Sequence, residues 1–160
     1  MASYDEDREI ARYDETLVSP ALAPLLAELR AAGLHTALAT SGSRKRMNAV
    51  LELYGLASSF DVALCREDTP REKPAPELFL AVASALAVSP SACLVIEDSV
   101  PGIAAARAAG MPVLGFVAYC PPNSMRPGAS AYLTSFEGLD LAQLRALWSA
   151  APAAVTIIPP

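Results

Sequence analysis

Apolar residues recur at helical spacing in several separate parts of the chain. In the first of these, leucines stand three or four residues apart between residues 22 and 29, after Ser19-Pro20 and before Gly33. Serine followed by proline is typical of a helix start, and glycine is typical of a helix end. The same periodicity predicts four further helices, over residues 47–54, 76–86, 102–109 and 139–150.

Short continuous apolar runs alternate with these predicted helices. They cover residues 34–40, 60–64, 93–96, 112–117 and 131–133. Runs of this length without polar alternation are typical of strands that are buried on both faces. Strands of this kind that alternate with helices predict an α/β fold, a Rossmann-like three-layer α/β/α core built on a parallel sheet.

Polar residues follow directly after two of the predicted strands. Thr40, Ser41 and Gly42 follow the first strand, and Glu97 and Asp98 follow the third. In a doubly wound sheet, ligands bind outside the carboxyl ends of the strands. Hydroxyl and backbone N–H groups near a helix start suit an anion, and carboxylates suit Mg²⁺. Each stretch taken alone is also compatible with a turn, an N-cap or a solvated surface.

Lys73 lies in a polar, proline-bearing loop before the 76–86 helix. A lysine in such a loop is usually a solvated surface charge. At the carboxyl edge of the sheet, its ammonium group would instead neutralise an anion as a point charge. Together with the two polar stretches, Lys73 predicts a site for a phosphate and a hard cation.

Composition and charge limit the classes of partner that this chain is expected to bind. The chain has 160 residues, 53% of them hydrophobic and 18% charged, with a net charge of −5. This length favours one domain, and the charges form no basic stripe for nucleic acid. No uncharged apolar run approaches the ~20 residues of a membrane span, and the first residues are acidic, unlike a signal peptide. The three cysteines, Cys65, Cys93 and Cys120, fit neither a disulfide framework nor a zinc site. We expect a cytoplasmic protein with no membrane or nucleic-acid partner.

Three segments resemble one protein family. The run KPAPELFLAVASALAVSPSACLVIEDSVPGIAAARAAGMPVLGF resembles the C-terminal half of haloacid dehalogenase (HAD) superfamily phosphatases. The similarity is to the branch that contains β-phosphoglucomutase and phosphoglycolate phosphatase. Upstream, LLAELRAAGLHTALATSGS resembles a helix and the second motif of that family, and downstream GASAYLTSFEGLD resembles its closing strand and helix. The resemblance covers residues 20–145 in the family's order.

The resemblance implies a Mg²⁺-dependent phosphatase or phosphomutase that acts on small sugar or organic phosphates. It implies that Asp98 holds Mg²⁺, with Glu97 as a second ligand or a partner that holds a water molecule. Positioning and charge stabilisation by such groups are what phosphoryl transfer requires. The residues that it assigns to phosphate binding are Thr40, Ser41, Gly42 and Lys73, of which Thr40 and Lys73 would take part in catalysis.

The first motif of that family, an apolar strand ending in D-x-D-G-T with the nucleophilic aspartate, is not found. Asp5-Glu6-Asp7 has the D-x-D spacing but no apolar strand, and an alignment on Asp14 would place Arg12 at the nucleophile. The nucleophile therefore stays unassigned, and we expect the chain as given to be incomplete for catalysis and to bind Mg²⁺ weakly. The alternatives are a non-catalytic phosphate-binding or protein-interaction module and an inactive truncated product.

The missing first strand also affects the expected domain organisation. We expect residues 1–18 to be a remnant of the family's cap-exit helix or an N-terminal arm, and residues 19–150 to be the core. In the family the first strand lies between the strands that end at Thr40 and Glu97, so its loss leaves two unpaired inner edges. Direct pairing of those strands, a segment of another molecule or the C-terminal run could fill the gap. We take residues 151–160 as a tail, with an extra strand as the alternative, and the open edges favour a homodimer.

Overall fold

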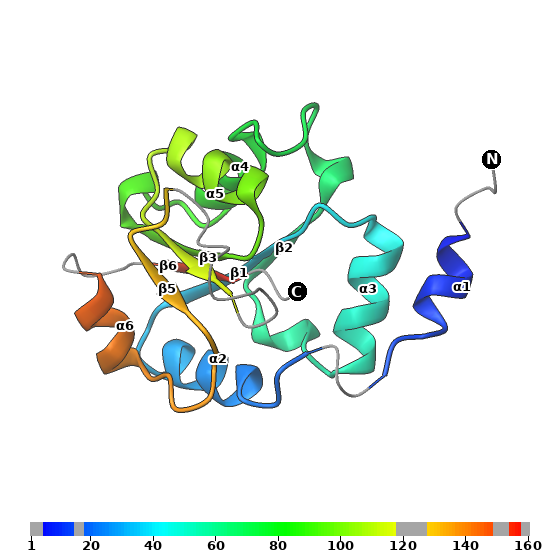
Figure 1. Ribbon diagram of the computed structural model, residues 1–160, viewed down its shortest axis with the longest axis horizontal. Helices are drawn as coiled ribbons and strands as arrows, with labels where there is room; N and C mark the ends of the chain where they lie inside the picture. Colours follow the sequence, from blue (N-terminus) through cyan, green and yellow to red (C-terminus); the bar gives the residue numbers. More distant parts are fainter. Residues whose placement is uncertain (1–4, 15–17, 118–127, 149–153, 158–160) are drawn as a thin grey trace.

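The computed structural model describes residues 5–14, 18–117 and 128–148, and the backbone of residues 154–157. Within these residues a six-stranded parallel sheet forms the middle layer, and its strand order is β2-β1-β6-β3-β4-β5 (Figure 1). This is the parallel α/β arrangement that the sequence predicts. The strands are β1 (His35–Ala39), β2 (Val62–Leu64), β3 (Cys93–Glu97), β4 (Val113–Phe116), β5 (Ala131–Leu133) and β6 (Ala154–Ile157).

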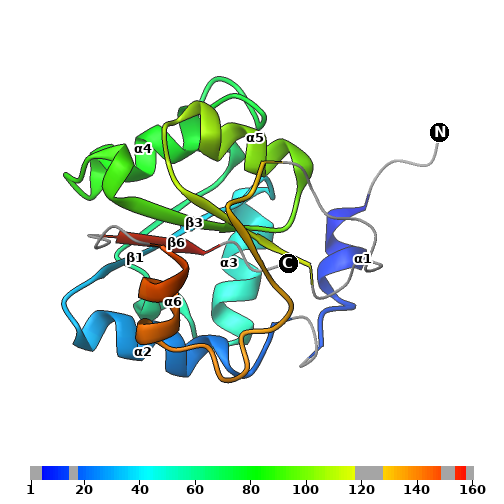
Figure 2. The same cartoon turned by 60° about the vertical axis from the view of Figure 1, so that its left-hand side comes forward.

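Helices cover both faces of the sheet, as Figure 2 shows. On one face lie α2 (Leu22–Ala31), α3 (Arg44–Leu53) and α6 (Leu141–Leu147), and on the other lie α4 (Glu77–Ala85) and α5 (Val100–Ala108). The three layers explain why the strands contain consecutive apolar residues rather than an apolar residue at every second position. The short 3-10 turns are η1 (Ala57–Ser59), η2 (Arg66–Asp68) and η3 (Pro90–Ala92).

Strand β3 illustrates how the core is divided. Leu94 and Ile96 pack in the cluster on the α2 side, whereas Cys93 and Val95 pack in the cluster on the α4 and α5 side. Successive side chains of a strand point to opposite faces, so a central strand supplies both clusters. All five residues of β3 are buried.

Serine caps fix the starts of two helices that lead away from the sheet edge. The Ser43 hydroxyl accepts a hydrogen bond from the Arg46 amide at 3.1 Å, and the Ser99 hydroxyl accepts one from the Gly102 amide at 3.0 Å. Both helices therefore begin two or three residues before the first apolar position used to predict them. Among the described helices, none is long and apolar enough to cross a membrane.

The C-terminal run Ala154–Ile157 is a strand in the middle of the sheet. It pairs in parallel with β1, where Thr156 stands opposite Ala37, and with β3, where Thr156 stands opposite Val95. The expectation of a tail is wrong for these four residues, because a strand that fills the gap satisfies backbone groups on both of its neighbours. The inner edges of β1 and β3 are thus paired within one chain.

The N-terminal arm is a short helix, α1 (Glu6–Ile10), which lies beside α3. Asp5 caps this helix by accepting a hydrogen bond from the Arg8 amide at 3.3 Å. The D-x-D spacing of Asp5 and Asp7 therefore lies at a helix start and not at the end of a buried strand. This agrees with the sequence argument against a first motif at this position.

Candidate functional site

The carboxyl ends of β1 and β3 lie on either side of β6 and carry the polar residues singled out in the sequence. Strand β1 ends at Ala39, directly before Thr40, and β3 ends at Glu97, directly before Asp98. The loop that follows β2 brings Lys73 to the same edge. The structure therefore gathers the sequence-predicted residues at the edge where a doubly wound sheet binds ligands.

Lys73 connects the ends of the two strands. Its Nζ donates to Glu97 Oε1 at 2.8 Å and to the Ala39 carbonyl oxygen at 3.1 Å. The side chain is only 4% exposed, and Nζ lies 4.8 Å from the centre of the Phe79 ring. Lys73 is thus a buried, fixed cation and not a solvated surface charge.

Glu97 is fully engaged by neighbouring groups. Its Oε1 accepts from Lys73, and its Oε2 accepts from the Ser99 amide at 2.6 Å and the Ser99 hydroxyl at 2.8 Å. The side chain is 1% exposed, so these contacts compensate for the removal of the carboxylate from water. Gly102 packs so closely that a Cβ at its position would lie 1.8 Å from Glu97 Oε1. Glu97 therefore positions Lys73 and the start of α5.

The Thr40-Ser41-Gly42 turn begins directly after β1. The Thr40 amide donates to the Leu64 carbonyl at 3.0 Å, which ties the turn to β2, and the Gly42 amide donates to Thr40 Oγ1 at 3.0 Å. Ser41 is exposed, whereas Thr40 and Gly42 are half-buried. The turn leads into Ser43, which caps α3. This turn and the Lys73 amine adjoin the same strand, because Lys73 Nζ contacts the carbonyl of Ala39.

Burial and neighbouring carboxylates act on Lys73 in opposite directions. Burial lowers the pKa of the Lys73 amine, and the charges of Glu97 and Asp98, with the Glu97 hydrogen bond, oppose that change. The pKa of Lys73 is lowered overall. An anion bound at this edge would favour the charged form of the amine.

The carboxylates at this edge do not form a complete cation site. Within the described part of the chain, no group of three or more His, Cys, Asp or Glu residues could hold a metal ion. Both oxygens of Glu97 already accept from Lys73 and Ser99. Mg²⁺ requires near-octahedral oxygen coordination, so the described residues do not fit a Mg²⁺ site by themselves.

A second polar cluster, which the sequence analysis did not identify, anchors the start of α3. The Glu67 carboxylate accepts from the Arg44 amide at 3.0 Å, and the Asp68 carboxylate pairs with the Arg44 guanidinium. The buried Cys65 thiol donates to Glu67 at 2.9 Å and to Asp68 at 3.3 Å. Burial, followed by these hydrogen bonds, raises the pKa of Cys65 to about 11. The cluster fixes α3, and with it the turn that precedes α3, to the loop after β2.

The raised pKa of Cys65 predicts a loss of stability at alkaline pH. The unfolded thiol titrates near 9.0 and the folded one near 11, so the stabilisation is complete below pH 9 and is lost as pH rises to about 11. The loss is at most about 1.4 kcal/mol per pH unit. Urea unfolding of the wild type and of Cys65→Ala across this range should show a steeper decline for the wild type. Parallel declines in the free energy of unfolding would show that the Cys65 thiol does not cause the loss.

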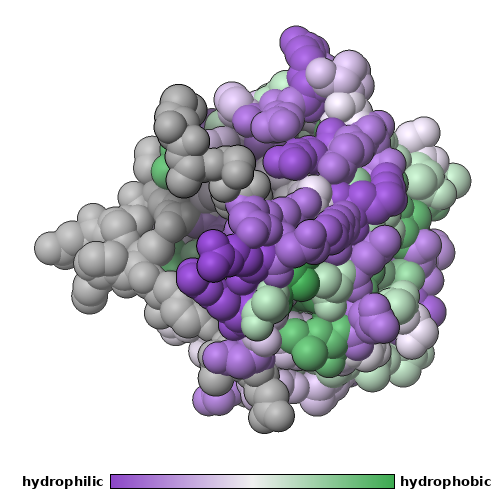
Figure 3. Space-filling view, turned by 90° about the vertical axis from the view of Figure 1, so that its right-hand side faces the viewer, coloured by the Kyte–Doolittle hydropathy of each residue, from purple (hydrophilic) through white to green (hydrophobic). Residues whose placement is uncertain are grey.

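The acidic arm lies over the basic start of α3. Asp7 pairs with Lys45, and Glu9 pairs with Arg46 at 2.8 Å. The Ser43 hydroxyl donates to the Glu6 carboxylate, so the arm also touches the cap residue of α3. Figure 3 shows the side of the molecule that carries α1 and α3, which is largely hydrophilic with a smaller hydrophobic patch.

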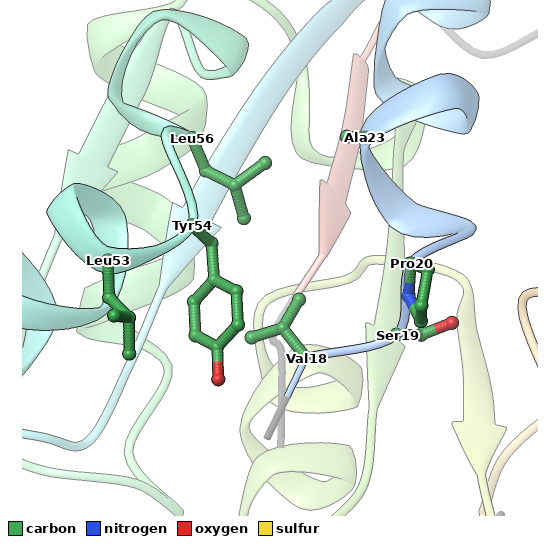
Figure 4. A pocket seen from close by; sticks show the side chains of 7 residues that line it. All are labelled: Val18, Ser19, Pro20, Ala23, Leu53, Tyr54 and Leu56. Carbon is green, nitrogen blue, oxygen red and sulfur yellow. The ribbon is translucent and has the colours of Figure 1, made fainter. Parts of the chain in front are cut away.

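An apolar cavity lies at the opposite end of α3 from Ser43. Figure 4 shows the side chains that line it, which come from the start of α2 and the end of α3. Its lining contains no described charged residue, so it lacks the groups that would hold a phosphate. The lining residues are Val18, Ser19, Pro20, Ala23, Leu53, Tyr54 and Leu56.

Comparison with known proteins identifies the family. A model of the haloacid dehalogenase-like hydrolase family matches residues 2–110. The chain belongs to this family. Among curated relatives, protein CbbY of Rhodobacter capsulatus is 34% identical over an alignment of 112 positions that covers 64% of this chain and 49% of CbbY. The putative phosphatase YhcW of Bacillus subtilis is 37% identical over 105 residues, 66% of this chain and 48% of YhcW.

Solved structures of HAD proteins have the same fold. CbbY from Rhodobacter sphaeroides in complex with xylulose-(1,5)bisphosphate superposes with a TM-score of 0.76 at 29% identity, covering 86% of this chain and 64% of that one. β-Phosphoglucomutase from Clostridium difficile gives a TM-score of 0.76 at 25% identity, covering 89% and 61%. These similarities place the chain in the branch of the family with β-phosphoglucomutase and phosphoglycolate phosphatase. The chain spans less than two thirds of each of these relatives.

Proposed function

We propose that this chain carries the phosphoryl-binding site of a HAD-like phosphatase or phosphomutase that acts on small sugar or organic phosphate monoesters. The Thr40-Ser41-Gly42 turn and Lys73 bind the phosphoryl group. Thr40 offers a hydroxyl at the end of a buried strand, where the Gly42 amide holds its Oγ1, and Lys73 offers a cation at the same strand end. Names of relatives such as Hexitol phosphatase B of Escherichia coli support this substrate class.

The contact that carries the proposal is the buried bridge from Lys73 to both Glu97 and the Ala39 carbonyl. It holds an amine, 4% exposed, at the ligand-binding edge of the sheet. A cation fixed in advance stabilises the charge that develops on phosphoryl oxygens without reorganisation at the moment of reaction. A solvated lysine would lose side-chain freedom on binding and would contribute less.

Hydrolysis through an aspartyl-phosphate also requires a carboxylate at the end of a central strand. β6 occupies that central position, and its described residues Ala154–Ile157 include no carboxylate. Asp5 and Asp7 belong to the N-terminal arm, where Asp7 pairs with Lys45. We therefore propose that the chain as given binds phosphate esters and does not turn them over.

Hydrolysis of an aryl phosphate ester by the purified chain, with Mg²⁺ present, tests this proposal. We expect no turnover above that of an Asp98→Ala variant, from samples shown to be folded by circular dichroism. Turnover that disappears in Asp98→Ala would mean that the chain holds a nucleophile, and Asp5, Asp7 and Asp14 would be replaced one at a time to find it. Equal turnover in both samples would indicate a contaminating phosphatase, which repurification would remove.

Weak Mg²⁺ binding is expected from the same geometry. We propose that Asp98 is the carboxylate that a cation at this edge would contact, because both oxygens of Glu97 accept from Lys73 and Ser99. One carboxylate supplies too few oxygens to replace the hydration shell of Mg²⁺. Calorimetric titration should therefore show no saturable binding at micromolar Mg²⁺. Tight binding that Asp98→Ala abolishes would contradict this expectation.

The non-catalytic alternative, a phosphate-binding or protein-interaction module, has one observation in its favour. α1 places Glu6 against Ser43 and Asp7 against Lys45, so carboxylates cover the start of α3 beside the Thr40-Ser41-Gly42 turn.

The cytoplasmic location and the homodimer predicted from the sequence stay predictions. The inner strand edges that motivated the homodimer are paired by β6 in this structure.

A further inference from the structure

The two central strands of this fold are held together by the last strand of the chain. In the described sheet, β1 and β3 each pair with β6, and β6 separates them. Four consecutive residues of β6, Ala154 to Ile157, have partners on both sides. The partners on β1 run from His35 to Leu38, and those on β3 run from Cys93 to Ile96.

Both neighbours lie in the interior of the protein. Every residue of β3 is buried, as are four of the five residues of β1. Buried backbone N–H and C=O groups that have no partner are strongly destabilising. An empty position between β1 and β3 would leave two facing rows of such groups, so a strand that pairs with both of them is strongly stabilising.

The position between β1 and β3 has a defined width and direction. Neighbouring strands lie about 4.8 Å apart, so the two strands leave room for one strand between them. Lys73 contacts Ala39 at the end of β1 and Glu97 at the end of β3, and thereby ties the two strands together at the carboxyl edge. The site therefore accepts one extended segment, parallel to both neighbours.

The strand that fills this site is the last described element of the chain. No described element follows β6, so β6 can leave its site without displacing another described helix or strand. Its sequence, Ala-Val-Thr-Ile, is uncharged and rich in β-branched residues, which favour strands. A strand that has these properties and that no described element follows can be exchanged between identical chains at low cost, because the same contacts form in the exchanged dimer.

We propose that the position between β1 and β3 is a strand-acceptor site, and that a second copy of this chain can fill it with its own β6. Each chain then donates one strand and accepts one, so that all strand pairs are retained. The ligand class of the site is a parallel, uncharged, β-branched segment of about four residues. A second copy is the natural donor, because its β6 already has the register that the site accepts.

A full-length Thr156→Pro variant tests the acceptor site. Thr156 stands opposite Ala37 and Val95, and proline at this position has no N–H for a central strand. The variant is refolded with and without a fluorescent synthetic peptide of residues 150–160. We expect one peptide to bind per chain and to restore a cooperative urea transition. The control is the same peptide with proline at position 156, which should neither bind nor restore folding.

Two outcomes of this test would overturn the acceptor site. The first is a Thr156→Pro variant with wild-type stability, because β6 would then contribute nothing to the central sheet. The second is a variant that fails to fold and is not rescued by the wild-type peptide. Rescue during refolding remains measurable even if the variant is unfolded by itself, so both cases give a decision.

The exchange of β6 between two copies of the chain is tested with the wild type. Refolding at high protein concentration should give a dimer, measured by light scattering after size exclusion, that persists on dilution because release of β6 requires partial unfolding. Refolding of Thr156→Pro under the same conditions should give no such dimer. A wild type that refolds only to monomer, or a dimer that forms equally in Thr156→Pro, would overturn exchange between copies.

Discussion

Replacement of Lys73 by methionine is expected to lower the free energy of unfolding by about 3–5 kcal/mol. Methionine preserves most of the apolar stem over Phe79 but removes the hydrogen bonds to Glu97 and to the Ala39 carbonyl. Glu97, only 1% exposed, would keep its contacts with Ser99 but lose its compensating charge. Urea unfolding at neutral pH measures the loss.

A double variant separates the effect of the unpaired buried charge from the effect of lost packing around Lys73. Lys73→Met combined with Glu97→Gln removes both charges, so the double variant should be more stable than Lys73→Met alone. A deficit of Lys73→Met below about 1 kcal/mol, or a double variant no more stable than Lys73→Met, would contradict the role of the pair.

Replacement of Gly102 by alanine is expected to destabilise the protein by about 1–3 kcal/mol, although it would ordinarily stabilise a helix by about 0.5–1 kcal/mol. The added methyl would lie 1.8 Å from Glu97 Oε1, so Glu97 must move away from Lys73 and Ser99. Phosphate binding should weaken in the same variant, because Lys73 loses the partner that positions it.

The matched control for this change lies on the same helix. Ala104 is an exposed residue of α5, and Ala104→Ser should change stability by no more than about 0.5 kcal/mol and leave phosphate binding unaffected. Thermal and urea unfolding of both variants give the comparison. A Gly102→Ala variant that is as stable as the wild type or more stable would show that the site can relax around Glu97.

Apolar spacing predicts most of this fold because its signals are local. The leucines of α2 and the continuous apolar residues of β3 fall where the pattern places them. The position of β6 could not be predicted in this way. Its β-branched residues are equally compatible with a tail, and the choice depends on the pairing of Ala154–Ile157 with β1 and β3, which are far away in the sequence.

The residues of the candidate site also form two groups, those that the sequence indicates and those that become neighbours only after folding. Thr40, Lys73 and Glu97 could be singled out because each follows a strand or belongs to a resembling motif. The partners that hold them could not, since the Ala39 carbonyl and the Phe79 ring become neighbours of Lys73 only after folding. Ser99 and Gly102 do have a local signal, a cap residue followed three residues later by glycine at a helix start.

Phosphate binding by the folded chain tests the central claim most directly. Titration of inorganic phosphate into the wild type, Thr40→Ala and Thr40→Ser can be followed by ³¹P NMR. The control is Ser91→Ala, because Ser91 lies in η3, before the start of β3 and away from its carboxyl end. We predict that Thr40→Ala weakens binding about tenfold or more, and that Thr40→Ser and Ser91→Ala retain it. Equal binding by the wild type and Thr40→Ala, or no binding by the folded wild type, would contradict a phosphoryl-binding site at this edge.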